Sequence, residues 1–299
     1  MLGATARSGV WLVPCANVRG GCGWGTIVAV PWRPPWERDE RDGYRVAFDE
    51  DADAYDRARP VAPARVFDDL VELAGLQPGS SIVEIGPGTG QATRPLAMRG
   101  LRILALELGP QLAARARQNL ASFADVEVMT ASFEAWDPGS TRVDAVFACN
   151  SFHWVDPAVR LPKSAAVLHP DGHLIVLATP WVVPDHADRF WWDVQDDYAA
   201  IGSERLDPAT QHPDRVADHW TLEPSTLFDE PTVHRHLFEV TFTADQYALN
   251  LSTQSGMKEF APSARAELID RIRHRINNRG GAVNASLLAV LTVARRRRR

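Results

Sequence analysis

Three glycines at alternate positions, Gly86, Gly88 and Gly90, are the residues of this chain whose spacing points most directly to chemistry. They follow the apolar run Ile82–Ile85, which is typical of a buried parallel strand, and they precede a segment that reads as a helix. Glycine allows a tight turn and lets a ligand approach the backbone, because it has no Cβ atom. The sequence therefore predicts a nucleotide-binding loop between a strand and a helix.

An acidic residue stands at the end of the next apolar segment. That segment, 101–107, ends in Glu107, and a carboxylate at this place suits hydrogen bonds with two ribose hydroxyls. A dinucleotide-binding loop has its third glycine at the position held here by Gln91, so this loop reads G-x-G-x-G instead. The difference disfavours an NAD-dependent oxidoreductase, which remains an alternative that a test of NAD binding would settle.

The composition is that of a globular protein, with 45% hydrophobic and 23% charged residues in a chain of 299. The net charge of −6 and the pI near 5.9 disfavour nucleic-acid binding over a broad basic face, so we expect a small-molecule substrate. The three cysteines give neither a disulfide framework nor a zinc spacing, and no apolar run reaches the roughly 18 residues of a transmembrane helix. We expect a cytoplasmic protein, monomeric or homodimeric, with no nucleic-acid or membrane partner.

The chain divides by composition into four parts. Residues 1–43 show no strand or helix period and are expected to be a disordered or non-native extension, with a substrate-facing or regulatory segment as the alternative. Residues 44–180 are expected to form an α/β core, and 181–231 a mostly helical insertion that caps the substrate. Residues 232–299 are expected to complete the sheet and to end in a basic, solvated tail.

Strands and helices alternate through the core, which predicts a parallel sheet with helices on both faces. The expected strands span 82–85, 102–107, 126–130, 143–148, 173–178, 233–242 and 287–294. The expected helices span 64–73, 90–99, 110–120, 157–168, 244–255 and 263–277. His169–Gly172 is predicted to be a turn that leads into the fifth strand.

From about Tyr55 to Arg295 the chain resembles the class I, Rossmann-like S-adenosylmethionine-dependent methyltransferases. It is most similar to the UbiE-like, or type 11, group, whose bacterial members share the opening Tyr-Asp-x-x-Arg-Pro found at 55–60. The resemblance implies a seven-stranded, mostly parallel sheet in the order 3-2-1-4-5-7-6, and S-adenosylmethionine as the cofactor. It does not identify the methylated molecule, because fold and cofactor do not determine the acceptor.

The same resemblance implies a set of residues for the cofactor. Those that would border its methionine part are Glu84, Gly86, Pro87, Gly88, Thr89 and Gly90. Glu107 would bind both ribose hydroxyls, and Leu108 would pack on the adenine. Many relatives carry an aspartate where this chain has Ser132, whose hydroxyl would accept the adenine hydrogen bond without charge assistance. Phe133 would line the adenine pocket, or would simply pack in the core.

The loop after the fourth strand and the segment at 55–59 carry the remaining candidates for the active site. Asn150 would contact cofactor or substrate, and His153 would act as a general base or, alternatively, form the wall of the pocket with Trp154. Tyr55 would close over the sulfonium or the substrate, and Arg59 would hold the cofactor carboxylate. The alternative for this pair is the surface of a helix.

Substrate contacts are expected from Trp154, Trp181 and Ser255. Trp181 belongs to a tryptophan-rich segment that suggests an apolar or aromatic substrate, with packing in the core as the alternative. His234 and His236 would point to one side of a strand, but no third ligand accompanies them at a motif spacing. We therefore expect surface histidines and no metal site.

These observations predict methyl transfer from S-adenosylmethionine to a small molecule. The methyl group of a sulfonium is already activated, so the reaction needs mainly alignment, which supplies about 7–11 kcal/mol in ideal intramolecular reactions. This explains why the sequence indicates a cofactor without an obvious catalytic dyad. A non-catalytic binding or regulatory protein that keeps the same fold is the other alternative.

Overall fold

The computed structural model describes residues 45, 48–217, 225–254, 256–257 and 260–298. The described residues of 34–179, 218–238 and 288–299 form one compact unit, here called the sheet unit. Those of 180–217 and 239–287 form a second, here called the aromatic unit. Each unit is described by itself.

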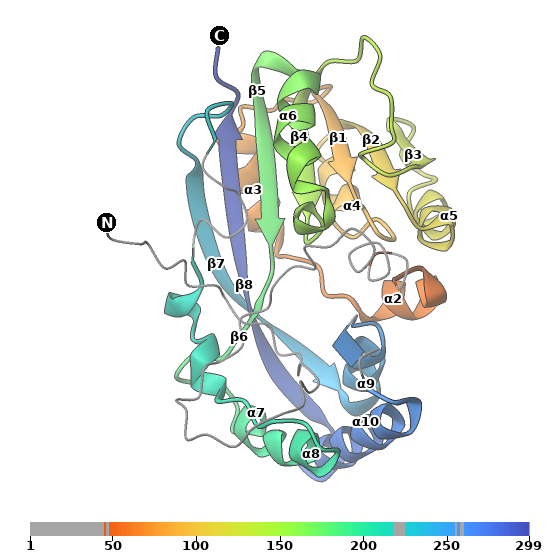
Figure 1. The fold of residues 1–299 in the computed structure, drawn as a ribbon, viewed down its shortest axis with the longest axis vertical. Helices are drawn as coiled ribbons and strands as arrows, with labels where there is room; N and C mark the ends of the chain where they lie inside the picture. The colour runs from red at the N-terminus through yellow and green to blue at the C-terminus, as the bar shows by residue number, and fades with distance from the viewer. Residues whose placement is uncertain (1–44, 46–47, 218–224, 255, 258–259, 299) are drawn as a thin grey trace. The chain divides into compact units, whose positions relative to one another are not determined.

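Strands and helices alternate in the sheet unit (Figure 1). Its strands are β1 (Ser81–Ile85), β2 (Arg102–Glu107), β3 (Val126–Thr130), β4 (Val143–Cys149) and β5 (Leu168–Ala178). Its helices are α2 (Ala52–Ala58), α3 (Ala64–Leu73), α4 (Thr93–Ala97), α5 (Pro110–Asn119) and α6 (Pro157–Val167), with 3-10 turns η1 (Phe48–Asp51) and η2 (Phe152–Trp154). The strands β7 (Thr232–Thr243) and β8 (Ala282–Arg295) have residues in both units.

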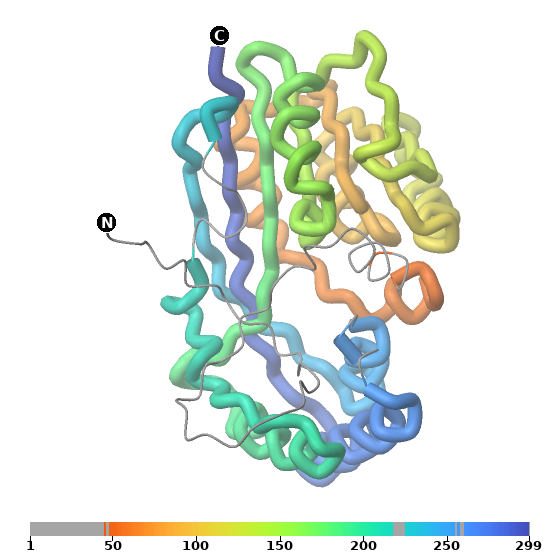
Figure 2. Tube along the Cα trace, in the orientation of Figure 1, coloured from red at the N-terminus to blue at the C-terminus, as the bar shows by residue number. Residues whose placement is uncertain are grey.

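The sheet of this unit has the strand order β3-β2-β1-β4-β5-β8, and β7 pairs with β8. The first five strands are parallel to one another, whereas β8 runs antiparallel to β5. The trace in Figure 2 shows β8 beside β5, although the two are far apart in the sequence. Because β7 and β8 are the sixth and seventh expected strands, the predicted order 3-2-1-4-5-7-6 is confirmed. The two-residue strand β6 (Trp181–Val182), which pairs with β8 in the aromatic unit, is an addition that was not predicted.

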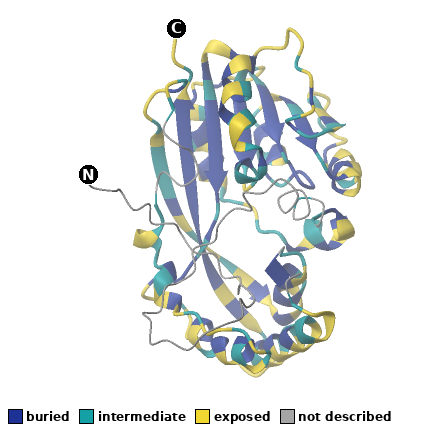
Figure 3. Cartoon of the chain, viewed as in Figure 1, coloured by how far each residue is buried: buried dark blue, intermediate teal, exposed yellow. Residues whose placement is uncertain are grey.

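Both faces of the sheet are covered by apolar side chains, as expected for a parallel sheet. One buried cluster joins α3, α4 and α5 to the sheet through residues such as Phe67, Leu96 and Ala113. The other joins α6 to the opposite face through Leu161 and Ala165. Figure 3 shows the central strands of this sheet largely buried and the outer surfaces of the helices exposed.

Local sequence explains most element boundaries, and two predictions were wrong. The predicted turn His169–Gly172 lies inside β5, whose pairing with β4 shifts register between Val143 and Ala145. Gly172 suits this bulge, because a Cβ atom there would lie 3.0 Å from the Asp144 carbonyl oxygen. The predicted helix 90–99 is shortened to α4, because Gly90 has a φ of 98°, outside the helical region.

The aromatic unit contains β6, α7 (Phe190–Asp193), α8 (Gln195–Ala200), η3 (Pro208–Gln211), η4 (Pro213–Arg215), α9 (Ala244–Ser252) and α10 (Pro262–Asn277). Five aromatic rings pack together in it, with centroids 5.1 to 6.0 Å apart. They belong to Trp181, Phe190, Trp191, Phe242 and Tyr247. All except Trp181 are buried, so these rings form the core of the unit. Among the described helices, none is long and apolar enough to cross a membrane.

Candidate cofactor site

The glycine loop follows β1 at the carboxyl edge of the sheet and has a backbone that favours glycine. Gly86 and Gly88 have φ angles of 64° and 61°, in the left-handed region. A Cβ atom on Gly86 would lie 2.8 Å from the Cβ of Ser151, and one on Gly88 would lie 3.0 Å from Cε1 of Tyr55. Glycine at these two positions thus allows Ser151, in the loop after β4, and the ring of Tyr55 to approach the glycine loop closely.

Glu107 lies at the end of β2 and faces this loop. Its two carboxylate oxygens accept hydrogen bonds from the backbone N–H groups of Gly88 and Gly109, each at 2.9 Å. Burial is the main cause that raises the pKa of Glu107 to about 7, and these backbone donors oppose the rise. A carboxylate has about four acceptor positions. The carboxylate can therefore accept a further hydrogen bond from a hydroxyl donor of a ligand.

Glu84 is a fully buried acid in the central strand β1, with 0% of its surface exposed. Within the described residues neither of its oxygens has a hydrogen-bond partner of good geometry, and neither has the Thr93 hydroxyl. Burial, reinforced by the charge of Glu107, raises the pKa of Glu84 to about 8, and the nearby Thr93 opposes this only in part. The carboxyl group is therefore mostly protonated at neutral pH, directly before the glycine loop.

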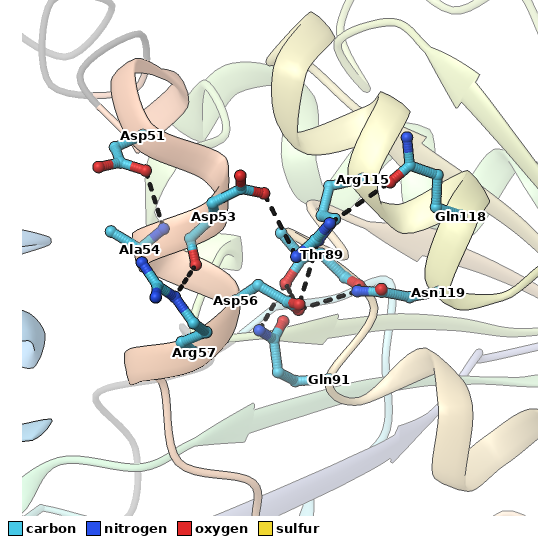
Figure 4. Close-up of polar contacts among 10 residues, drawn as sticks. All are labelled: Asp51, Asp53, Ala54, Asp56, Arg57, Thr89, Gln91, Arg115, Gln118 and Asn119. Carbon is cyan, nitrogen blue, oxygen red and sulfur yellow. Dashed lines mark hydrogen bonds and ion pairs between the residues drawn. The ribbon is translucent and has the colours of Figure 1, made fainter.

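Helix α2 is fastened to the loop by Asp56 (Figure 4). Oδ1 of Asp56 accepts hydrogen bonds from the hydroxyl of Thr89 at 2.7 Å and from Nδ2 of Asn119 at 2.8 Å. Oδ2 accepts a third from Nε of Arg115 at 3.2 Å. One carboxylate thus joins α2, the glycine loop and α5. The sequence contains this aspartate in the Tyr-Asp-x-x-Arg-Pro motif but gave no indication of its partners.

The same helix places Tyr55 and Arg59, the pair expected at the cofactor or on a helix surface. The Tyr55 ring lies against Gly88, and burial raises the pKa of its hydroxyl. The guanidinium carbon of Arg59 lies 4.9 Å from the centroid of that ring and 6.0 Å from that of Phe48. Both residues are half-buried, so neither stands on a fully exposed helix surface, and their role at a cofactor stays a prediction.

Asp49, in η1, is a second aspartate that sequence reasoning missed. Its Oδ1 accepts hydrogen bonds from the backbone N–H groups of Gln111 and Leu112, at 2.8 and 2.9 Å. These groups belong to the first turn of α5, whose N–H groups have no partner within the helix. The acidic segment 49–53 is the only sequence signal for this cap.

The loop after β4 holds Asn150, His153 and Trp154. Asn150 has a φ of 53°, and its side-chain amide exchanges hydrogen bonds with Thr179, at 2.7 and 2.8 Å. Its amide is thus already used to join the ends of β4 and β5. Burial, together with the charge of Arg160, lowers the pKa of His153 to about 3. At neutral pH the imidazole is uncharged and is a weak base.

Trp154 lies next to His153, with ring centroids 4.9 Å apart, and 5.8 Å from the ring of Phe48. It therefore belongs to an aromatic group that also includes Tyr55, whose ring centroid is 6.3 Å from that of Phe48. This arrangement brings two of the sequence-predicted residues, Tyr55 and Trp154, to the same part of the sheet unit.

The segment after β3 differs from what the resemblance implies. The hydroxyl of Ser132 accepts a hydrogen bond from the backbone N–H of Ala135 at 3.1 Å, so it closes a turn. Phe133 is 1% exposed and stacks on Trp136, which favours core packing for this residue. Glu134 is held by Arg45 at 2.9 and 3.1 Å.

The remaining predicted residues are placed as follows. Leu108 is half-buried after β2, while Pro87 and Thr89 are buried in the glycine loop. Trp181 lies in the aromatic unit, and Ser255 lies outside the described residues, as does the extension 1–43.

The expectation of surface histidines was wrong for His236, which is 9% exposed, while His234 is half-buried. Both lie near Asp69, a residue that sequence reasoning did not connect with them.

Comparison with known proteins points to one enzyme class. A family model described as a methyltransferase domain matches residues 83–176. An uncharacterized methyltransferase of Mycobacterium tuberculosis is 29% identical over 248 residues, which cover 82% of this chain and 91% of that protein. An rRNA adenine N-6-methyltransferase of Saccharopolyspora erythraea is 33% identical over 106 residues, 36% of this chain and 26% of that protein.

A solved structure described as a type II methyltransferase from Anaeromyxobacter dehalogenans shares the fold, with a TM-score of 0.56 and 19% identity over 80% of this chain and 97% of that one. These findings favour a methyltransferase over the oxidoreductase and the non-catalytic protein that the sequence left open. Together with the Rossmann-like fold, these findings support an enzyme of the class I methyltransferases.

Proposed function

We propose that this enzyme transfers a methyl group from S-adenosylmethionine to a small molecule. The observation that carries the cofactor is Glu107 at the end of β2. Its carboxylate is oriented by the N–H groups of Gly88 and Gly109, and an acid so placed suits hydrogen bonds with the hydroxyls of a ribose. The parallel sheet fixes this acid beside the glycine loop, so the residues fit a nucleoside-containing cofactor.

The other end of the cofactor would lie along the glycine loop. Gly86, Gly88 and Gly90 allow close approach, Tyr55 on α2 lies against Gly88, and Arg59, directly after α2, lies over the Tyr55 ring. Arg59 would hold the cofactor carboxylate, as the resemblance implies. Glu107, whose pKa of about 7 leaves it partly ionised at neutral pH, would add negative charge beside the loop, which suits a ligand that carries a positive sulfonium and an ammonium group.

When bound, S-adenosylmethionine supplies an activated methyl group, and the protein has to align the acceptor with it and exclude water. Burial and a pKa near 3 favour the second of the two roles expected for His153, a wall of the pocket beside Trp154. We therefore expect an acceptor whose nucleophile does not need an imidazole base of normal strength.

The acceptor is proposed to be a small molecule, because the chain carries a net negative charge and its basic terminal run is paired with acids. The basic run at the end of the chain pairs with acids of the sheet unit: Arg298 lies 2.6 Å from Asp171, and Arg297 lies 3.3 Å from Asp229. With a net charge of −6, such a surface does not suit a phosphate backbone. The match to the rRNA adenine N-6-methyltransferase covers only 36% of this chain and does not decide its acceptor.

Calorimetric titration of S-adenosylmethionine and S-adenosylhomocysteine tests the cofactor. We expect both to bind the wild type, and Glu107→Gln to weaken binding at least about tenfold, because hydrogen bonds to a charged acceptor are worth about 1.5–3 kcal/mol. Glu127→Gln, which changes an exposed acid on the neighbouring strand β3, is the matched control and should bind like the wild type. Folded wild type that binds neither compound would rule out the proposed cofactor.

The acceptor class is tested separately, by methyl transfer from labelled cofactor to a panel of small molecules and to total RNA. Label in small-molecule products supports the proposal. Label in RNA alone would overturn the small-molecule part and leave the cofactor site intact.

A further inference from the structure

We propose that Asp69, His234 and His236 form a binding site for one divalent transition-metal ion of the zinc type. Asp69 lies on α3, and the two histidines are alternate residues of β7, so their side chains leave the same face of that strand. All three belong to the sheet unit, although 165 positions separate Asp69 from His234. The site is built from elements other than the glycine loop, so it is independent of the proposed function.

The ligand atoms are already close to metal-binding distances. One nitrogen from each histidine and one oxygen from Asp69 lie within 4.8 Å of one another. Oδ2 of Asp69 is 3.0 Å from Nδ1 of His234 and 2.8 Å from Nε2 of His236. Ligands of a tetrahedral zinc ion, with bonds of about 2.0–2.2 Å, lie about 3.3 Å apart. Opening the two oxygen–nitrogen distances by a few tenths of an ångström would bring them to this value.

The hydrogen bonding of this cluster is incomplete without a cation. Oδ2 of Asp69 faces both imidazoles, and His234 is its hydrogen-bond partner. Nε2 of His236 is buried and, among the described residues, has no partner in hydrogen-bond geometry, although it lies near the same oxygen. A buried nitrogen without a hydrogen bond is costly. A single ion in the plane of that ring would bind its lone pair, the second imidazole and the carboxylate together.

The chemistry of the three ligands limits the kind of ion. Two imidazoles and one carboxylate suit zinc, cobalt, iron and copper, whereas calcium and magnesium prefer an all-oxygen shell. Three protein ligands leave at least one position for water. The ion would join α3, which packs on one face of the sheet, to β7, which pairs with β8. We therefore expect it to stabilise the fold of the sheet unit.

The test uses the full-length protein without a histidine tag, stripped of metal by a chelator and titrated with Zn²⁺ in a calorimeter. We expect one equivalent to bind, and Asp69→Asn and His234→Gln each to weaken that binding at least tenfold. His169→Gln removes an exposed histidine on β5 of the same unit and should leave the binding unchanged. Circular dichroism would establish that each variant is folded.

Two further readouts separate this site from adventitious zinc. Zn²⁺ should raise the melting temperature of the wild type and of His169→Gln but not of the other two variants, because only binding to the folded state stabilises it. Bound Co²⁺ should show the visible absorption of a four- or five-coordinate ion. Folded wild type that binds no Zn²⁺ would overturn the proposal. Zinc affinity in Asp69→Asn and His234→Gln equal to that of the wild type would overturn it too.

Discussion

The buried carboxyl group of Glu84 should make the stability of the protein decrease as the pH rises. Its pKa is about 8 in the folded protein, compared with a reference value of 4.5 for an exposed glutamate. Between these two values the folded chain binds one more proton than the unfolded chain, so unfolding becomes more favourable with each increase in pH. The contribution is fully present below the unfolded pKa and is lost as the pH rises through the folded one.

The size of the effect follows from the two pKa values. Each pH unit within this window changes the free energy of unfolding by about 1.36 kcal/mol for one proton. Between about pH 5 and pH 8 the loss is therefore on the order of 3 kcal/mol, a large part of the total stability of an ordinary domain. Glu107 acts in the same direction, because its pKa is also raised, to about 7.

The substitution Glu84→Gln isolates the first contribution, because glutamine has nearly the same shape and does not titrate. Urea unfolding at about pH 5, 6, 7 and 8 should show the wild type losing stability relative to the variant by on the order of 3 kcal/mol across the series. Glu72→Gln removes an exposed carboxyl from α3 and should run parallel to the wild type. Parallel curves for Glu84→Gln and the wild type would refute the assignment of a buried, protonated Glu84.

Two further predictions concern the glycine loop. The affinity for S-adenosylmethionine relative to S-adenosylhomocysteine should increase from about pH 6 to about pH 8, because Glu107, with a pKa of about 7, gains negative charge that favours the sulfonium. Calorimetry at both pH values measures the two affinities, and a constant ratio between them would contradict the prediction. Gly88→Ala should weaken cofactor binding roughly tenfold, because a left-handed backbone costs about 1–2 kcal/mol in residues other than glycine and the new Cβ would lie 3.0 Å from the Tyr55 ring. The control is Gly139→Ala, at a position that is also left-handed but open. Equal cofactor affinities in both variants would argue against a close approach at Gly88.

The parts of this protein that local sequence dictates were predicted well. The strands β1 to β4 begin and end within one residue of the expected ranges, because short apolar runs between turn residues determine them. The acid at the end of β2 reaches the glycine loop for the same reason: parallel strands end at one edge of the sheet. The apolar runs were sufficient to predict the strand bounds, and the rule that parallel strands end at one edge was sufficient to predict the place of Glu107.

Contacts that depend on tertiary packing were not predictable. Asp69 meets His234 across 165 positions, and no spacing rule connects a helix residue with a strand that follows six others. Asn150 was expected at a ligand, but its amide finds Thr179 once β4 and β5 lie side by side. Phe133 reads equally well as a pocket wall or as core, and only its packing on Trp136 separates the two.

The attachment of α2 by Asp56 also has a consequence for how the protein is made. The ribosome synthesises α2 before any strand of the sheet, yet the partners of Asp56 belong to the loop after β1 and to α5. During synthesis, Asp56 of this helix therefore cannot bind all of its partners until the chain up to about residue 119 has left the exit tunnel. This agrees with the general observation that domains fold as units during translation. The cofactor site is thus completed by a segment made early, which has to wait for the sheet to form.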